Sequence, residues 1–388
     1  MIALAIRYWK QYWGRSLLLS LALLLAVALP LFVELMLRSM THTLQERAES
    51  TPYLIGSPAS RFDLTFAALF HRQGSFQKLT WSDFQELQQQ TAAKVIPVFQ
   101  PKTSRKDAIV GIDSRYLPMR GMSFSEGEGL KQLGDCLIGS AVQALHQVGP
   151  GDQLLTQPTS LLDVSARGQF ALNISGVLAT AHTAEDRAVF VSLETAWVLA
   201  GLGHGHMAID SLSEEQARQL EHESVEGSSS LLPTSQQFNA ETLKSFHFHG
   251  DRGEFPIDYL IVVPADQTEA LLLEGKVRHQ SHLQWIRPAE VVEELLTQLL
   301  QLTRLLQSVL VLVGLACLSL AGLILSLNWN SRKSERETLY RMGVSRMQLA
   351  QLFAYDLLLL ALPVVLLMSL MLLLLPQVSA GVLQVLTR

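Results

Sequence analysis

The sequence predicts an α+β extracytoplasmic domain carried by a helical transmembrane bundle. Three long apolar segments, one near the start of the chain and two near its end, each have about the 20 residues that a spanning helix needs. Between the first and the second segment, residues 38–304 have the composition of a globular domain. Strand-like and helix-like patterns alternate there, which is typical of the α+β class.

The three apolar segments are residues 17–37, 305–329 and 354–376. They are rich in Leu, Val and Ala and almost free of charge, with Glu34 near the far end of the first. They are too long for ordinary core helices, so we expect three spanning helices in a lipid bilayer. The first is expected to be an uncleaved anchor, because no small-residue cleavage site follows it closely.

Basic residues predict the orientation of the chain. Residues 1–16 hold three Lys or Arg, and residues 330–353 hold five against two Glu. Because cytoplasmic segments carry an excess of Lys and Arg, both belong in the cytoplasm. Residues 38–304 and a short tail, 377–388, then lie outside. Aromatic and basic residues interleave in residues 1–16, as they do in helices that lie flat in the membrane interface.

Composition argues against several functions. The net charge is −5 and the predicted cytoplasmic segments are basic, so the outer domain is acidic, which argues against nucleic acid. The two cysteines, Cys136 and Cys317, lie in different compartments and no CxxC motif occurs, so no disulfide is expected. The chain lacks a GxxxxGK[ST] phosphate loop and the HExxH and GxSxG motifs, so it is not expected to be an enzyme.

Residues 38–304 are expected to form short strands and helices joined by turns. Residues 223–237, rich in Ser and Gly, are interpreted as a loop or an insertion between two lobes. Strands are expected at residues 94–99, 108–112, 153–156, 170–178, 188–193 and 259–263, and helices at 81–93, 140–147, 193–202, 213–224 and 265–274.

Both ends of the outer domain are predicted to continue as helices into the membrane. Pro288 is well placed in a first helical turn, and an apolar run at helical spacing then enters the second span without a break. A weaker extension, residues 39–49, follows the first span. Two interpretations are open: a pair of stalk-like helices, or amphipathic helices at the membrane surface.

Several motifs then follow one another in an order that resembles a known family. The outer domain contains LIGSA at 137–141, VGPGDQL at 148–154, NISGVL at 173–178 and VFVSLE at 189–194. This succession is similar to the periplasmic core domain of MacB-type permeases. The cytoplasmic segment contains RKSERE at 332–337 and RMGVSR at 341–346, which resemble the coupling segment of the same MacB/FtsX family of ABC transporter permeases.

The resemblance implies a multi-pass permease of the bacterial inner membrane whose large domain lies in the periplasm. It implies a separate cytoplasmic ABC ATPase, a permease dimer, and transmission of ATP-driven motion to the periplasmic domain. Export, lipoprotein extraction and mechanotransmission to a periplasmic partner stay open, and no cofactor is required. Coupling to the ATPase is assigned to Glu335, Arg336, Glu337, Arg341, Gly343 and Arg346.

Simple positive-inside anchoring would explain the basic residues among these coupling residues, but it would not explain the glutamates or the Gly-Val-Ser break, where Gly343 is expected to allow a sharp turn.

One departure from the family is plain. Its members have a fourth span, whereas only residues 377–388 follow the third span here, too few to recross a bilayer. Truncation, completion by a partner and function with three spans all stay open.

The histidines suggest a second class of function. His204 and His206 form one HxH pair and His247 and His249 form another. In an extended strand alternate residues share a face, so each pair is suited to gripping one metal ion, and imidazole with nearby carboxylates favours zinc. Solvent-exposed loop histidines are the other interpretation. A zinc site without an ATPase partner would indicate a membrane-anchored metal sensor or scaffold. The remaining histidines, among them His71, are expected to be structural or exposed.

Overall fold

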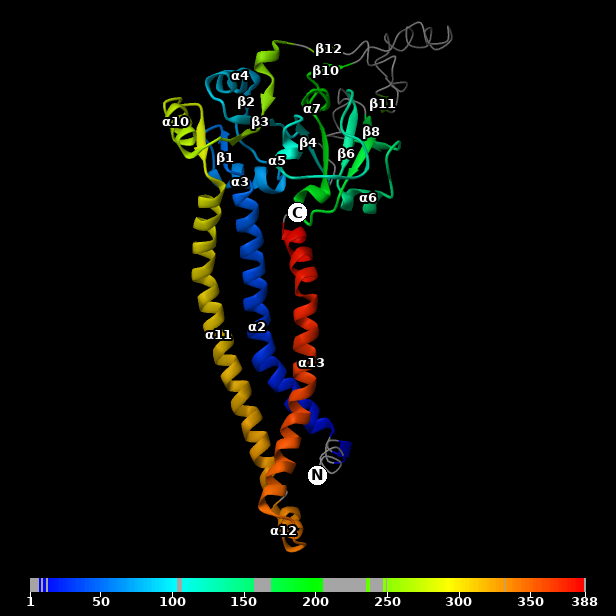
Figure 1. The fold of residues 1–388 in the computed structure, drawn as a ribbon, viewed down its shortest axis with the longest axis vertical. Helices are drawn as coiled ribbons and strands as arrows, with labels where there is room; N and C mark the ends of the chain where they lie inside the picture. Colours follow the sequence, from blue (N-terminus) through cyan, green and yellow to red (C-terminus); the bar gives the residue numbers. More distant parts are fainter. Residues whose placement is uncertain are drawn as a thin grey trace, which may run out of the picture. The chain divides into compact units, whose positions relative to one another are not determined.

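The computed structural model describes residues 7, 10–11, 13–102, 107–156, 169–204, 235–237, 247–248, 250–331 and 333–386. The chain divides into two compact units (Figure 1). The first comprises Met1–Gln45 with Glu293–Leu386, and the second comprises Glu46–Val292. The predicted interfacial helix, residues 1–16, lies mostly outside the described residues.

Long helices make up the first unit. Helix α2 (Trp13–Glu49) and helix α11 (Pro288–Ser331) each run without interruption from this unit into the second, which agrees with the predicted helical extensions. The unit also contains the short helix α12 (Lys333–Arg341) and the long helix α13 (Arg346–Leu386). Helix α13 continues through Pro376, where we expected the third span to end.

Within the described part of the chain, one stretch is long and apolar enough to cross a membrane. It is Gln307–Leu327 of α11, and a shorter apolar stretch, Ala361–Leu370, lies in α13. The other two spans therefore stay predictions from the sequence.

The second unit contains two lobes, each built on a sheet. The sheet of the first lobe is antiparallel, in the order β15-β1-β14-β3. Its strands are β1 (Tyr53–Gly56), β3 (Lys94–Val98), β14 (Tyr259–Val263) and β15 (Gln284–Ile286), and its helices are α3 (Arg61–Phe70), α4 (Trp81–Gln90) and α10 (Gln267–Arg278). Helix α4 begins with a capping box in which Thr80 and Asp83 satisfy each other's backbone N–H.

The sheet of the second lobe is mixed, in the order β11-β8-β6-β9-β4, with β5 and β7 also paired to β8. Its central strand β9 is almost wholly buried, as expected for an uninterrupted apolar run with a strand on each side. The elements are β4 (Ala108–Ile112), α5 (Tyr116–Met119), β5 (Phe124–Gly127), β6 (Asp135–Ile138), α6 (Ser140–His146), β7 (Gln153–Leu155), β8 (Gln169–Leu178), η1 (Ala184–Arg187), β9 (Ala188–Ser192), α7 (Leu193–Leu199) and β11 (Ser235–Gln237).

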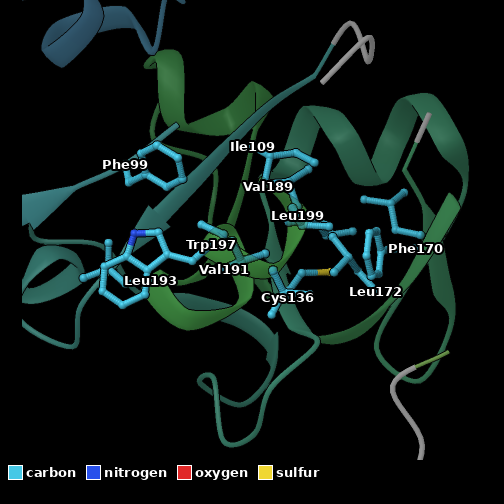
Figure 2. Close-up of a cluster of buried hydrophobic side chains, with 14 of the residues drawn as sticks. Phe99, Ile109, Cys136, Phe170, Leu172, Val189, Val191, Leu193, Trp197 and Leu199 are labelled. Carbon is cyan, nitrogen blue, oxygen red and sulfur yellow. The ribbon is translucent and has the colours of Figure 1, made fainter. Parts of the chain in front are cut away.

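Trp197 belongs to one core cluster of this unit (Figure 2). Its ring is fully buried among side chains that include Val191 and Cys136, and its indole N–H donates to the carbonyl of Pro256 at 2.9 Å. Pro256 belongs to the small pair β2 (Leu79–Thr80) and β13 (Pro256–Ile257), and a second small pair joins β10 (Gly203–His204) to β12 (His247–Phe248).

The predicted elements can be compared directly with this fold. The six predicted strands are present as β3, β4, β7, β8, β9 and β14, and four predicted helices are present as α4, α6, α7 and α10. The fifth predicted helix, residues 213–224, lies outside the described residues. The loop predicted at 223–237 needs a correction, because Ser235–Gln237 pairs in parallel with β8 as strand β11.

Candidate functional site

The cytoplasmic segment predicted to contact an ATPase is built around one tryptophan. Trp329 lies in the last turns of α11, and the guanidinium carbon of Arg336 in α12 lies 3.8 Å from the centroid of its ring. Arg336 Nη1 also donates to the carbonyl of Trp329. On α13, the ring of Phe353 meets the same indole edge to face, with centroids 4.7 Å apart. A cation–π contact therefore fastens α12 to α11, and an aromatic contact fastens α13 to the same tryptophan of α11.

A tight turn then separates α12 from α13. Gly343 has φ +92°, in the left-handed region that favours glycine. Its N–H donates to the carbonyl of Tyr340 at 3.0 Å, and the N–H of Val344 donates to that of Leu339 at 3.1 Å. This pair of bonds is the Schellman ending of a helix. The sharp turn expected from the Gly-Val-Ser break is therefore present.

Helix α13 begins directly after this turn, and its first residues form a reciprocal cap. The backbone N–H of Gln348 donates to Ser345 Oγ at 3.3 Å, and the N–H of Ser345 donates to Gln348 Oε1 at 3.0 Å. This is a capping box, in which two otherwise unsatisfied N–H groups at a helix start are paired. Residues 333–353 thus form two helices joined by a defined turn rather than a loose loop.

Several residues of this segment face solvent, and we call them the elbow surface. Glu337, Arg341 and Arg346, all predicted to couple, are exposed, whereas Arg336 is half-buried against Trp329. Three exposed apolar residues beside them carry no signal of their own in the sequence. The elbow surface comprises Glu337, Tyr340, Arg341, Met342, Arg346 and Met347, and its three apolar side chains are 54%, 69% and 71% exposed in chain order. Exposed aromatic and Met side chains beside Arg are typical of protein interfaces.

A second polar contact joins helices within the first unit. Gln307 Nε2 of α11 donates to the carboxylate of Glu34 on α2, and Arg38 Nε donates to the same carboxylate at 2.7 Å. A carboxylate at membrane depth is costly unless it is paired, and such residues often mark functional positions. The structure thus gives Glu34, which the sequence analysis noted only as a charge near the end of a span, a partner on another helix.

The predicted metal ligands are described only in part. His204 ends β10 and His247 begins β12, and the antiparallel register sets these two residues directly opposite each other. His206 and His249 lie outside the described residues. Among the residues that are described, no group of three or more His, Cys, Asp or Glu is arranged to hold a metal ion.

Comparison with known proteins gives one family match. Residues 16–223, more than half of the 388-residue chain, match the family model described as MacB-like periplasmic core domain. The comparison with curated proteins finds no match.

Solved structures with some likeness include the periplasmic region of MacB from Actinobacillus actinomycetemcomitans, with 11% identity over 63% of this chain and 92% of that chain and a TM-score of 0.35. The extracellular domain of the noncanonic ABC-type transporter YknZ from Gram-positive bacteria has 10% identity, covers 61% and 98% of the two chains, and has a TM-score of 0.30. A domain of a protein described as a permease, from Porphyromonas gingivalis, has 13% identity, coverages of 61% and 87%, and a TM-score of 0.26.

Proposed function

Because the chain belongs to the MacB/FtsX-like family of ABC transporter permeases, we propose that it transmits the motion of a separate cytoplasmic ATPase to its periplasmic domain. The family is generally a non-enzymatic membrane component of transporters, located in the inner membrane with this domain in the periplasm. ATP chemistry then belongs to the partner subunit. The finer role, ATP-driven coupling through α12, is our proposal.

The elbow surface is the observation that carries this proposal. It combines exposed charges of both signs with exposed apolar side chains, a composition suited to docking a protein. Arg336 has a different role from the other coupling residues, since its side chain is engaged with Trp329. A force applied to α12 would therefore reach α11 and α13 through Trp329 and Phe353, which is what a coupling helix requires.

Co-purification tests the docking step. The full chain, co-expressed with an ABC ATPase subunit from the same organism, is expected to retain that ATPase on an affinity resin. The double variant Glu337→Ala/Arg341→Ala should lose at least about tenfold of the retained ATPase, which corresponds to about 1.4 kcal/mol. The control is Glu128→Ala/Lys131→Ala, which removes an exposed ion pair of the outer domain. Equal retention by both variants would contradict docking at the elbow surface.

The assembly and the cargo are part of the same proposal. A permease dimer would let two ATPases close on nucleotide together. Export, lipoprotein extraction and activation of a periplasmic partner all use this arrangement. Cross-linking of the full chain in membranes, read by its mass on a denaturing gel, distinguishes a homodimer from a heterodimer.

A metal-binding role is the second candidate, and the register of β10 and β12 favours it. His204 and His247 are directly opposed, so the two HxH motifs begin from paired positions. Zinc titration of the full chain by calorimetry is expected to give binding that disappears in His204/His206/His247/His249→Ala and persists in the control His279/His282→Ala. Zinc binding without an ATPase partner would favour a metal sensor or scaffold. Identical heats for both variants would eliminate the site.

A further inference from the structure

A buried charged cluster lies in the second unit, where α2 ends. Glu185 of η1 is 1% exposed, and its carboxylate accepts a hydrogen bond from Arg47 Nη2 in the last turn of α2. Arg120 Nε, just after α5, lies 3.6 Å from Glu185 Oε1, and His71 Nε2, at the end of α3, lies 3.7 Å from it. Four elements that are far apart in the sequence therefore meet at one carboxylate.

The two arginines also hold the backbone around them. Arg47 Nε donates to the carbonyl of Leu69 at 3.0 Å, and Arg120 Nη2 donates to that of Ala68 at 3.1 Å, so both satisfy the last turns of α3. Arg120 Nη1 donates to Thr51 Oγ1, just beyond α2, at 2.6 Å. The end of α2 is thus held by its own arginine and by one from α5.

Electrostatics make Glu185 the centre of this cluster. Burial raises the pKa of its carboxyl, but the charges of Arg47 and Arg120 and the neighbouring His71 outweigh burial and hold the pKa well below the usual range. Its charge is the counter-ion that makes two buried guanidinium groups tolerable, because a buried charge without a partner is strongly destabilising. Replacing the carboxylate would therefore release both arginines.

Gly139 has no side chain, so the backbone of η1 can pack closely against it. An ideal Cβ on Gly139, in the LIGSA motif, would overlap the carbonyl oxygens of Glu185 and Asp186. The N–H of Gly139 donates to the carbonyl of Ala188, the first residue of β9, at 3.0 Å. Strand β6 and the start of α6 therefore hold η1 against the second lobe, so that Glu185 is fixed to β9 rather than to a free loop.

We propose that Glu185 is the positioning residue that fastens the end of α2 to the second lobe and delivers movement of the helix to β9. Along the chain, α2 leads first into β1 of the first lobe, whereas the bond between Arg47 and Glu185 crosses 138 residues to reach η1 directly. This role rests on the proposed function, since it requires an ATPase that moves the helix.

A matched control lies in the first lobe. Asp258 is also buried, with Lys78 Nζ 2.8 Å from its Oδ1 and the N–H of Gln100 donating to its Oδ2 at 2.5 Å. Asp258→Asn removes a buried, ion-paired carboxylate without touching α2 or η1. Comparison with Glu185→Gln separates loss of fastening from general loss of stability.

Hydrogen exchange of the full chain in lipid nanodiscs tests the local contact first. Without an ATPase, the backbone amide hydrogens of residues 47–51 should exchange at least about tenfold faster in the Glu185→Gln variant than in the wild type, which corresponds to about 1.4 kcal/mol. In the Asp258→Asn variant their exchange rates should be unchanged. Unchanged exchange at these amides in Glu185→Gln would overturn the proposal. If Glu185→Gln does not fold, Arg47→Gln, which keeps the Glu185–Arg120 pair, carries the same expectation.

The second arm adds the co-purified ATPase and a non-hydrolysable ATP analogue. In the wild type and in Asp258→Asn, nucleotide should change the exchange of residues 184–192. In Glu185→Gln this change should be lost while ATPase binding and ATP hydrolysis persist. A nucleotide response retained in Glu185→Gln would refute the transmission role alone. A wild type with no response would refute the proposed function, and this role with it.

Discussion

Neither His71 nor Glu185 carries a sequence signal for the buried cluster that the two residues share. The sequence places His71 among histidines expected to be structural or exposed, and in the structure it is 3% exposed, with no hydrogen-bond partner for either ring nitrogen among the described residues. Glu185 lies in a short acidic stretch that resembles any surface turn. Their partners are distant in sequence and leave no periodic pattern, so the cluster could be found only from the fold.

The buried imidazole predicts a pH dependence. Burial lowers the pKa of His71 below 6.5, although Glu185 opposes this, and Arg47 and Arg120 add to the lowering. The unfolded chain therefore binds a proton that the folded chain does not. Stability of the outer domain should fall as the pH drops below about 6.5, by at most about 1.4 kcal/mol per pH unit from this group.

Urea unfolding of the full chain between about pH 7.5 and about pH 5.5, monitored by tryptophan fluorescence, measures this slope. Replacement of the group, His71→Asn, should flatten the slope relative to the wild type, whereas His279→Asn, on the surface of the first lobe, should not. Parallel slopes for the wild type and His71→Asn would show that His71 does not titrate as its burial implies.

At the scale of elements, apolar pattern was a reliable guide where the strands were long. Strands β8 and β9 were found because their apolar runs are bounded by turn residues. Strands β1 and β6 have only four residues each and were missed, whereas the three-residue strand β7 was found from the Gly-Pro-Gly turn that precedes it. The turn at Gly343 could be predicted from the Gly-Val-Ser break. The stacking of Arg336 on Trp329 could not be predicted, because it depends on how α11 and α12 pack together.

The LIGSA motif gives a prediction at this scale. Because a Cβ on Gly139 would overlap the backbone of η1, Gly139→Ala should force η1 outward and lower the free energy of unfolding of the outer domain by about 1–3 kcal/mol. The same substitution at Gly149, where nothing lies within 4 Å of an added Cβ, should change it by less than about 0.5 kcal/mol. Chemical unfolding of both variants decides, and equal stabilities would contradict the packing argument.

At the scale of the whole molecule, the orientation of the chain in the membrane is the largest prediction that rests on charge. Basic residues assign α12 to the cytoplasm, and the family match assigns the outer domain to the periplasm. Hydropathy identified the apolar segments, but the number of spans depends on how each helix meets lipid, which composition does not determine. Of the described helices, the part of α11 from Gln307 to Leu327 meets the length and composition of a span.

Cysteine accessibility tests this topology. Lys131, in the outer domain, and Thr338, in α12, are both exposed. With Cys136 and Cys317 replaced by Ser, Lys131→Cys should react in spheroplasts with a membrane-impermeant maleimide, and Thr338→Cys should react only after the membrane is permeabilised. Labelling of Thr338→Cys in intact spheroplasts would reverse the assigned orientation.

The two polar contacts of α2 restrict how that helix can move. Glu34 pairs with Gln307, and Arg47 pairs with Glu185. The two positions are thirteen residues apart on one uninterrupted helix, or about 20 Å along its axis and about 140° around it. A rotation of α2 about its axis would move the side chains of Glu34 and Arg47 sideways in different directions. A displacement of α2 along its axis would move both side chains in the same direction. Under the proposed coupling, the spacing therefore favours a displacement along the axis of α2 over a rotation about that axis.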